Sequence, residues 1–499
     1  MSKLKNLAGQ TAIYGISTIL VRLINYVLAP IQTRVITDQA AFGIISVIFA
    51  YIAFLNVIFM YGMETSYFRF ASKAEDKNQV FKTANTMLFF STILLVSLLI
   101  IFARPIAQFI HYPDHANIVK VFALIIGFDT LVNIPFAKLR LEGKPIKYLL
   151  IKLCNVCTNV GLNLFFLAPA YLHKPALFGV IGFYFNENYI VYYVFIAQLI
   201  ASFLTFAIFL PSIFKTGLEW NKQIAKTLWK YGSPLIIVGL AGIVNEVIDR
   251  VMLKRFLSGT SNEVDIKIGI YSACYKVAIL MNLCVQAFRM GAEPFFFKQA
   301  KEKDAKKTNA DVMLVFSIFM LAMFLVISLF LNYFIAIIGK NYRSGLYIVP
   351  YLCIAYYLLG IFYNLSTWYK LTDKTHLASY VSITGAAATI ISTYILIPHF
   401  DILAGALGTI VGYGTMCILS YLMGQKFYPV QYNLSKMLFY LLFALGLYTI
   451  SHLWIQHQVN NEWIRVTIHL LFIILFISVA YSWDFKSKIK LDKNNAHES

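Results

Sequence analysis

Residues 42–63 read FGIISVIFAYIAFLNVIFMYGM, an apolar run that contains no charged side chain. A helix needs roughly 20 mainly apolar residues to cross the hydrocarbon of a bilayer. Similar runs recur along almost the whole chain, and no polar stretch between them is long enough to form a soluble domain. The pattern therefore predicts an all-α polytopic membrane protein with about fourteen transmembrane helices.

The composition agrees with one continuous membrane domain, because 59% of the residues are hydrophobic, only 13% are charged and the mean hydropathy is +0.70. The first apolar run contains Arg22 and Asn25 and lacks a small-residue cleavage site, so we expect it to stay as a span. The predicted spans are 11–32, 42–63, 84–103, 118–138, 148–170, 190–211, 234–255, 268–289, 312–337, 346–368, 377–397, 402–423, 436–455 and 464–482.

The net charge of +19 reflects how the chain is oriented in the membrane rather than the binding of a polyanionic partner. With a cytoplasmic amino terminus, 28 of the 42 lysines and arginines fall in inside segments, and 9 fall in outside segments. Cytoplasmic loops of membrane proteins carry this excess of basic residues. The distribution predicts that both termini are cytoplasmic, and it argues against nucleic-acid binding.

An internal repeat divides the chain into two halves. Phe42-Gly43 opens the second span and Ile268-Gly269 opens the eighth, and a glutamate follows the glycine after 21 residues in the first copy and 24 in the second. An offset of six spans preserves orientation, as in the parallel repeats of several transporter folds. The repeat predicts an N-terminal lobe over 1–212 (helices 1–6), a C-terminal lobe over 213–430 (helices 7–12), and helices 13–14 with a tail over 431–499.

Charged residues near mid-membrane are the strongest functional signal, because lipid cannot solvate them. In the first span Arg22 shares a helix face with Asn25, about 16 Å from the inner end. Arg22 therefore faces water, a carboxylate or an anionic substrate, and a purely structural ion pair is the alternative. Lys276 in the eighth span could pair with Asp249, or it could line a cavity that attracts anions.

Four further charges are candidates for ion coupling or for an intramembrane ion pair. Glu246 and Arg250 are spaced as an i, i+4 pair in the seventh span, and Asp249 is on a neighbouring face. Two neighbouring carboxylates in a low-dielectric site raise each other's proton affinity, which makes H+ or Na+ a candidate coupling ion. Asp129 in the fourth span is also near mid-depth, where pairing with Arg22 is one possibility and the partner stays open.

The fifth span carries a polar ladder. Asn155, Asn159 and Asn163 follow Lys152 at spacings of three and four residues, so all four side chains share one helix face. Hydrogen bonding between helices explains this stripe as readily as a substrate path does.

Enzyme signatures are missing from the sequence. It contains no G-x-x-x-x-G-K-[ST] and no G-x-S-x-G, and histidines and carboxylates do not cluster at metal-ligand spacing. We expect no catalytic residue, no metal and no cofactor, and a transport role driven by an ion gradient, the membrane potential or the substrate gradient.

Several short motifs lie within the spans or at their ends: Ala8-Gly9-Gln10-Thr11, Phe42-Gly43, Asp249-Arg250, Ile268-Gly269-Ile270-Tyr271 and Glu293-Pro294-Phe295-Phe296. These motifs resemble those of the polysaccharide-transporter branch (Wzx-type flippases) of the multidrug/oligosaccharidyl-lipid/polysaccharide exporter superfamily. The resemblance covers roughly residues 1–425, and two further spans are typical of fourteen-span members.

The resemblance implies a two-lobe architecture, like that of multidrug exporters of this superfamily, around a central cationic cavity in the bacterial cytoplasmic membrane. It further implies that an undecaprenyl-diphosphate-linked oligosaccharide moves across the membrane by alternating access, for surface polysaccharide biosynthesis. Arg22, Asn25 and Lys276 would then line the substrate cavity. A polysaccharide polymerase or other assembly proteins are candidate partners, and two other functions stay open: a cation-coupled multidrug exporter and a non-transporting scaffold for a glycan-assembly complex.

Overall fold

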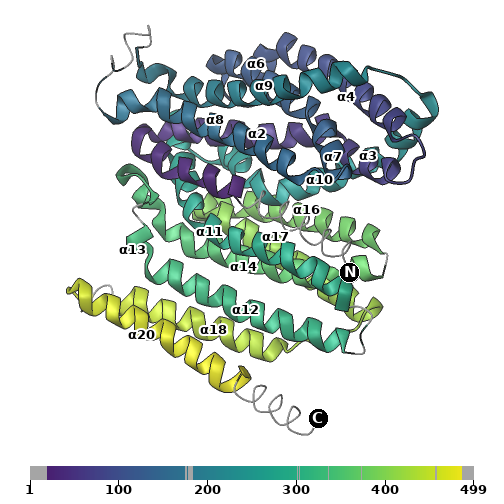
Figure 1. Ribbon diagram of the computed structural model, residues 1–499. Coiled ribbons are helices and arrows are strands. Elements are labelled where there is room, and N and C mark those ends of the chain that lie inside the picture. Colours follow the sequence, from purple (N-terminus) through teal and green to yellow (C-terminus); the bar gives the residue numbers. More distant parts are fainter. Residues whose placement is uncertain are drawn as a thin grey trace. The chain divides into compact units, whose positions relative to one another are not determined.

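The computed structural model describes residues 20–485 except 173, 175, 176, 178–183, 300, 301, 303, 335, 336, 373, 456 and 457. Within these residues the chain consists of helices and connecting segments, without strands (Figure 1). Twelve helices of this part of the chain are long and apolar enough to span a membrane. The predicted all-α membrane fold is confirmed.

The twelve helices correspond to twelve of the fourteen predicted spans. Of the first span, the structure describes a helix over 20–35, and the motif beginning at Ala8 lies outside the described residues. The seventh span is α10 (Lys222–Phe256), which is helical but carries the charges of Glu246, Asp249 and Arg250 within its apolar part. The total of about fourteen therefore stays a prediction.

The chain divides into two compact units, and each is described by itself. The first contains residues up to Ala273 with Gly339–Tyr342 and Ala386–Gly408, and the second contains Cys274–Ile338, Arg343–Gly385 and the chain from Thr409. The first unit therefore includes α10, beyond the lobe boundary predicted at residue 212. The division into lobes over 1–212, 213–430 and 431–499 therefore remains a prediction.

Six long helices build most of the first unit. Helix α9 packs on α8 and α6, α4 packs on α6, and α10 packs along α2 (Figure 1). Their bounds and those of the shorter elements are α2 (Gln39–Met60), α3 (Met63–Ala71), α4 (Lys77–Ile101), α5 (Ala103–Phe109), η1 (Pro113–His115), α6 (Ala116–Leu131), α7 (Asn133–Leu141), α8 (Pro145–Tyr171), η3 (Glu187–Tyr189) and α9 (Ile190–Thr216).

The second predicted span ends in a sharp break. Helix α2 begins at the N-cap Asp38, whose carboxylate accepts a hydrogen bond from the Ala40 N–H, 2.9 Å away. It ends where Tyr61 and Gly62 adopt left-handed backbone angles, φ 32° and 69°. A side chain at Gly62 would contact the Gly232 carbonyl oxygen of α10. The glycine therefore allows the turn that places α3 against α10.

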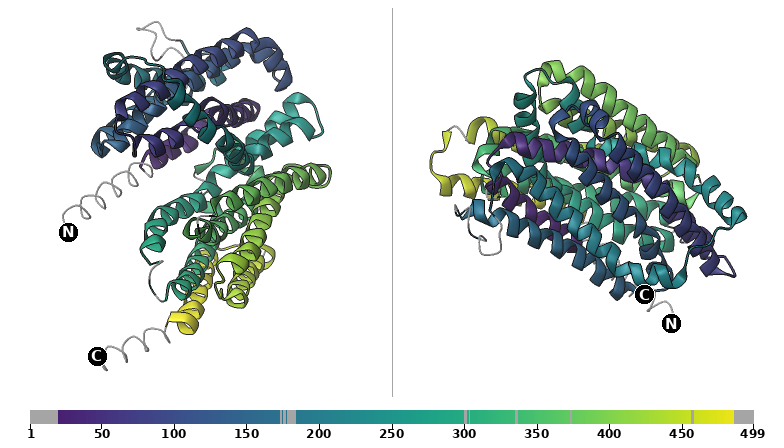
Figure 2. Two further views of the ribbon diagram at one scale, coloured as in Figure 1. Left: turned by 90° about the vertical axis from the view of Figure 1, so that its right-hand side faces the viewer. Right: turned by 90° about the horizontal axis from the view of Figure 1, so that it is seen from above.

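In the second unit α12 (Ala305–Leu329) packs against α14 (Val349–Leu365), α18 (Leu434–Ile450) and α20 (Glu462–Ala480), the last two drawn in yellow-green and yellow (Figure 2). The remaining elements are α13 (Leu331–Phe334), η5 (Lys340–Ile348), α15 (Thr367–Leu371), the two π-helical turns η6 (Ser451–Ile455) and η7 (Tyr481–Phe485), and three helices with residues in both units, α11 (Ser261–Gln299), α16 (Thr375–Phe400) and α17 (Leu403–Phe427).

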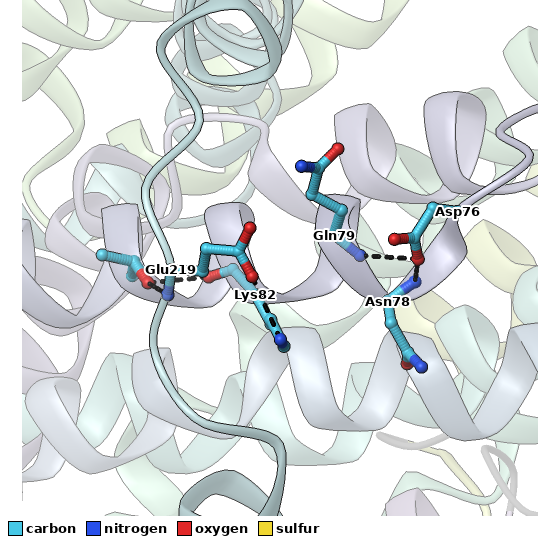
Figure 3. A network of polar contacts seen from close by, with 6 residues as sticks. Asp76, Asn78, Gln79, Lys82 and Glu219 are labelled. Atoms are coloured by element: carbon cyan, nitrogen blue, oxygen red, sulfur yellow. Dashed lines mark hydrogen bonds and ion pairs between the residues drawn. The ribbon is translucent and has the colours of Figure 1, made fainter.

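Polar contacts join Glu219, in the connection between α9 and α10, to α4 (Figure 3). The Asp76 carboxylate caps α4 by accepting hydrogen bonds from the N–H groups of Asn78 and Gln79. One turn further on, Lys82 Nζ lies 3.0 Å from Glu219 Oε2, and the Glu219 N–H donates to the Thr86 hydroxyl. These bonds fix the position from which α10 begins.

Candidate functional site

Two of the places where polar side chains gather among the described residues of the first unit contain predicted site residues. One is a cavity whose wall includes Asp129, called here the Asp129 cavity. The other is a buried group formed by Asp249, Arg250 and Tyr271, called here the Asp249 cluster. Because a polar group in the hydrocarbon region must be satisfied by the protein or by water, both places are candidates for function.

The Asp129 cavity has a volume of about 270 Å3 and a mostly polar wall. It lies among the five helices α2, α6, α7, α8 and α9, together with the start of α3. Its lining residues are Asn56, Met60, Glu64, Asp129, Val132, Asn133, Phe136, Tyr148, Lys152, Asn155, Gln198 and Thr205.

The carboxylate of Asp129 has a polar and a charged neighbour on other helices. The Ser202 hydroxyl of α9 and the Lys152 ammonium of α8 both interact with it electrostatically. The Lys152 ammonium also lies 4.3 Å from the centre of the Phe136 ring. Lys152 is thus the cation that acts on Asp129 across the cavity, and no ion pair joins Asp129 to Arg22 among the described residues.

One side of the Asp129 cavity reaches the surface. Glu64, at the start of α3, forms an ion pair with Arg140 of α7 at 2.6 Å, and about 40% of each side chain is exposed. Glu64 also interacts electrostatically with the Lys152 ammonium. The end of the Asp129 cavity at Glu64 is therefore exposed, whereas Asp129 and Lys152 lie deeper in the wall.

The asparagine ladder joins helices. Asn155 donates to the Ala201 carbonyl and to the Thr205 hydroxyl of α9, at 3.1 and 2.9 Å. Asn163 donates to Asn159 one turn earlier and accepts from Gln32 of helix 20–35, at 3.0 Å. These contacts favour the helix-packing interpretation, although Asn155 also lines the Asp129 cavity.

The Asp249 cluster is a compact ion pair. Asp249 is only 2% exposed, and its Oδ1 lies 3.1 Å from Arg250 Nη1 while its Oδ2 accepts a hydrogen bond from the Tyr271 hydroxyl at 2.5 Å. Arg250 also donates to the backbone carbonyl of Glu246, 3.3 Å away. Both oxygens of the carboxylate are therefore engaged within the protein.

Tyr271 is the residue whose role the sequence did not reveal. Its place in the Ile268-Gly269-Ile270-Tyr271 motif marked the repeat, and the residue of the eighth span considered as a partner of Asp249 was Lys276 rather than Tyr271. The ring fits because Gly405 of α17 has no side chain: a Cβ there would lie 3.1 to 3.3 Å from Tyr271. Beside it, Thr389 of α16 donates to the Asn245 side chain at 3.1 Å.

The three predicted substrate-cavity residues are divided between the two units. Arg22 and Asn25 have exposed side chains on helix 20–35 of the first unit. Lys276 is half-buried on α11 and belongs to the second unit. An exposed arginine halfway along a span requires an aqueous or anionic environment, because lipid cannot solvate it.

Comparisons with solved structures show the fold. Over 94% of this chain and 99% of the other, the structure resembles a lipid II flippase MurJ in an inward closed conformation, with a TM-score of 0.70 and 15% identity. It also resembles an inward-facing multidrug resistance MATE transporter of the same superfamily, with a TM-score of 0.60 and 13% identity over 83% and 97%. A mutant of the Vibrio cholerae MATE transporter VcmN gives a TM-score of 0.54 and 16% identity over 85% and 96%.

No curated protein sequence matches the chain significantly. The sequence pattern of the family described as polysaccharide biosynthesis protein matches residues 7–299, which is more than half of the chain. The family and the fold agree with the expected exporter superfamily. The chain therefore belongs to the polysaccharide biosynthesis protein family, within the multidrug/oligosaccharidyl-lipid/polysaccharide exporter superfamily of multi-pass membrane transporters.

Proposed function

We propose that this protein is a flippase that moves an undecaprenyl-diphosphate-linked oligosaccharide across the bacterial cytoplasmic membrane for surface polysaccharide biosynthesis. The family match over residues 7–299 carries the proposal, because the fold alone is shared with drug exporters. The basic excess of the inside segments supports a cytoplasmic location for both termini.

The substrate's diphosphate needs cations along its path. Arg22 and Lys276 are the proposed residues, since both are basic and lie within spans. A guanidinium matches two phosphate oxygens at once, which an ammonium does not. Asn25, three residues after Arg22 on the same face, is proposed to donate hydrogen bonds to the glycan.

Asp129 is the proposed coupling site for H+ or Na+. It lies in a cavity that reaches the surface beside Glu64, and Lys152 in the same wall interacts with it electrostatically. Asp249 is less suited to exchange an ion, because Arg250 and Tyr271 occupy both of its oxygens. We assign the Asp249 cluster, with Glu246 beside it, to the structural support of α10 and α11.

The test is surface polysaccharide in cells that carry Arg22→Ala or Arg22→Lys in place of the wild-type protein. Arg22→Ala is expected to abolish the polysaccharide at a normal protein level, and Arg22→Lys to restore part of it. Full export by Arg22→Ala would remove Arg22 from the mechanism. Vesicles that contain the purified protein and a fluorescent lipid-linked glycan test translocation directly. If correctly folded protein does not translocate the glycan in these vesicles, the scaffold function is favoured.

The resemblance to MATE transporters leaves one alternative function open, that of a cation-coupled multidrug exporter. Cationic drugs require acidic side chains in the cavity, whereas the proposed substrate residues here are basic. Resistance to cationic drugs that depends on Asp129 but not on Arg22 would favour the exporter.

A further inference from the structure

A second cavity lies entirely within the second unit, at the end of its helices that we expect to face the cytoplasm. Its volume is about 290 Å3, the lower limit of small-molecule sites and too small for a whole oligosaccharide. Residues near the ends of three predicted spans form the wall, on α11, on α14 and α15, and on α16. We call it the Arg289 cavity.

The wall combines cations, hydroxyls and aromatic rings. Arg289 of α11 and Lys370 of α15 supply positive charge, and Ser366, Thr367 and Ser382 supply hydroxyl groups. None of the described residues that line it carries a carboxylate. A cavity with this lining attracts an anion and repels a cation.

The guanidinium of Arg289 is held in place by a ring. Its Cζ lies 4.6 Å from the centre of the Tyr363 ring on α14, and its side chain is exposed. Because a cation–π contact uses none of the N–H donors, the guanidinium can still bind two oxygens of a phosphate.

Close packing makes this wall rigid. Directly before Arg289 on α11, Phe288 stacks on Phe316 of α12, with ring centres 4.0 Å apart. Gly360 of α14 allows that approach, because a Cβ there would lie 2.7 Å from the Phe316 ring. Arg289 is therefore presented from a fixed surface and loses little freedom on binding.

Other cations of this unit repeat the pattern near the same predicted side. Lys374 lies 3.5 Å and Lys426 lies 5.8 Å from the centre of the Phe427 ring, and Lys306 lies 5.2 Å from that of Tyr428. Basic pockets between helices on the cytoplasmic side are suited to anionic lipid headgroups. Aromatic rings are common at the same interface.

From these observations we infer that the Arg289 cavity binds the anionic phosphate headgroup of a membrane lipid from the cytoplasmic leaflet. Two lipids present this chemistry, an anionic phospholipid and the polyprenyl phosphate end of the proposed substrate. Binding of the phospholipid stands independently of the proposed function, whereas binding of the polyprenyl phosphate rests on it.

The test uses the full-length protein in detergent with undecaprenyl phosphate, phosphatidylglycerol or zwitterionic phosphatidylcholine, and measures bound lipid by native mass spectrometry. The wild type is expected to retain at least one of the two anionic lipids in preference to phosphatidylcholine. Arg289→Gln is expected to lower that occupancy about fivefold, the effect of one basic residue that faces an anionic lipid. Retention of undecaprenyl phosphate identifies the substrate as a source, and retention of phosphatidylglycerol identifies a resident phospholipid.

Arg69→Gln is the matched control. Arg69 is also exposed and stacks on a ring, that of Tyr231 at 4.4 Å, but it is not among the residues lining the Arg289 cavity. Lipid occupancy in this variant should equal that of the wild type. Lys370→Gln should also lower the lipid occupancy, and it leaves the contact between Arg289 and the Tyr363 ring in place. Wild-type occupancy in both Arg289→Gln and Lys370→Gln, or equal retention of phosphatidylcholine, would overturn the inference.

Discussion

Gly43 of α2 and Gly269 of α11 lie against each other, and they hold equivalent positions in the two copies of the repeat. A side chain on Gly43 would overlap the backbone carbonyl of Asp265, four residues before Gly269. A side chain on Gly269 would overlap the carbonyl of Gln39, four residues before Gly43. This reciprocity is the contact that two copies related by a local two-fold axis would make.

Substituting either glycine should therefore disrupt the same contact. Gly43→Ala and Gly269→Ala each place a methyl group on backbone that cannot yield locally, and we expect each to lower the free energy of unfolding by about 1–3 kcal/mol. Thermal unfolding of the purified protein in detergent measures the loss. Gly161→Ala is the control, because a Cβ there meets nothing within 4 Å, and an equal loss in all three variants would contradict the assignment.

The hydrogen bond from Tyr271 to Asp249 predicts a stability effect rather than a direct effect on transport. Tyr271→Phe removes the 2.5 Å bond and leaves one oxygen of a buried carboxylate unsatisfied, which costs about 1–3 kcal/mol. Thermal unfolding should show this loss, while the variant protein that remains folded retains its transport rate. Tyr26→Phe is the control, since no described residue hydrogen-bonds the buried Tyr26 hydroxyl. Loss of transport at unchanged stability would instead place Asp249 in the mechanism.

The hydropathy pattern predicted most of the fold because it is a strong signal repeated along the chain. Twelve spans agree with helices of the structure. The break at Tyr61 and Gly62 was not predicted, because an apolar run does not show where the backbone turns. The contact between Gly43 and Gly269 was not predicted either, although both glycines marked the repeat.

The site was harder to predict because pairing joins residues that are distant in sequence. Spacing along one helix related Asp249 to its neighbours on α10, and the structure adds Tyr271 of α11 as a partner. Asp129 had no charged neighbour within its own span, and the structure places Lys152 of another helix in the same cavity wall. Local periodicity places side chains on a face, but it does not say which face of which helix they meet.

The ion pair between Lys82 and Glu219 predicts a pH-dependent contribution to stability. Hydrogen bonds from Lys82 and Gln79 hold the pKa of the Glu219 carboxyl below its ordinary value of 4.5. Because the folded-state pKa is lowered, the stabilisation is complete above the ordinary value and is lost as the pH falls through the folded value. Glu219→Gln should lower the unfolding temperature at pH 7 and have less effect below about pH 4.

The control for Glu219→Gln is the variant that lacks both charges, Lys82→Gln with Glu219→Gln. The difference in unfolding temperature between this double variant and Lys82→Gln alone should be smaller than the difference between Glu219→Gln and the wild type. The reason is that the partner of Glu219 is already absent from Lys82→Gln. A Glu219→Gln effect that is the same at pH 7 and at about pH 3.5 would show that the ion pair contributes nothing to stability.

Asp129→Asn separates coupling from substrate binding. The amide keeps the size of the side chain but can neither take up a proton nor balance a sodium ion, so an imposed gradient should no longer accelerate glycan translocation in vesicles. Translocation driven by the substrate gradient alone should continue, because Arg22 and Lys276 are unchanged. Asp114→Asn, at an exposed position of η1, is the matched control. If gradient-driven translocation persists in Asp129→Asn, the pair of Asp129 and Lys152 serves only to hold α6 against α8, and the coupling ion binds elsewhere or is absent.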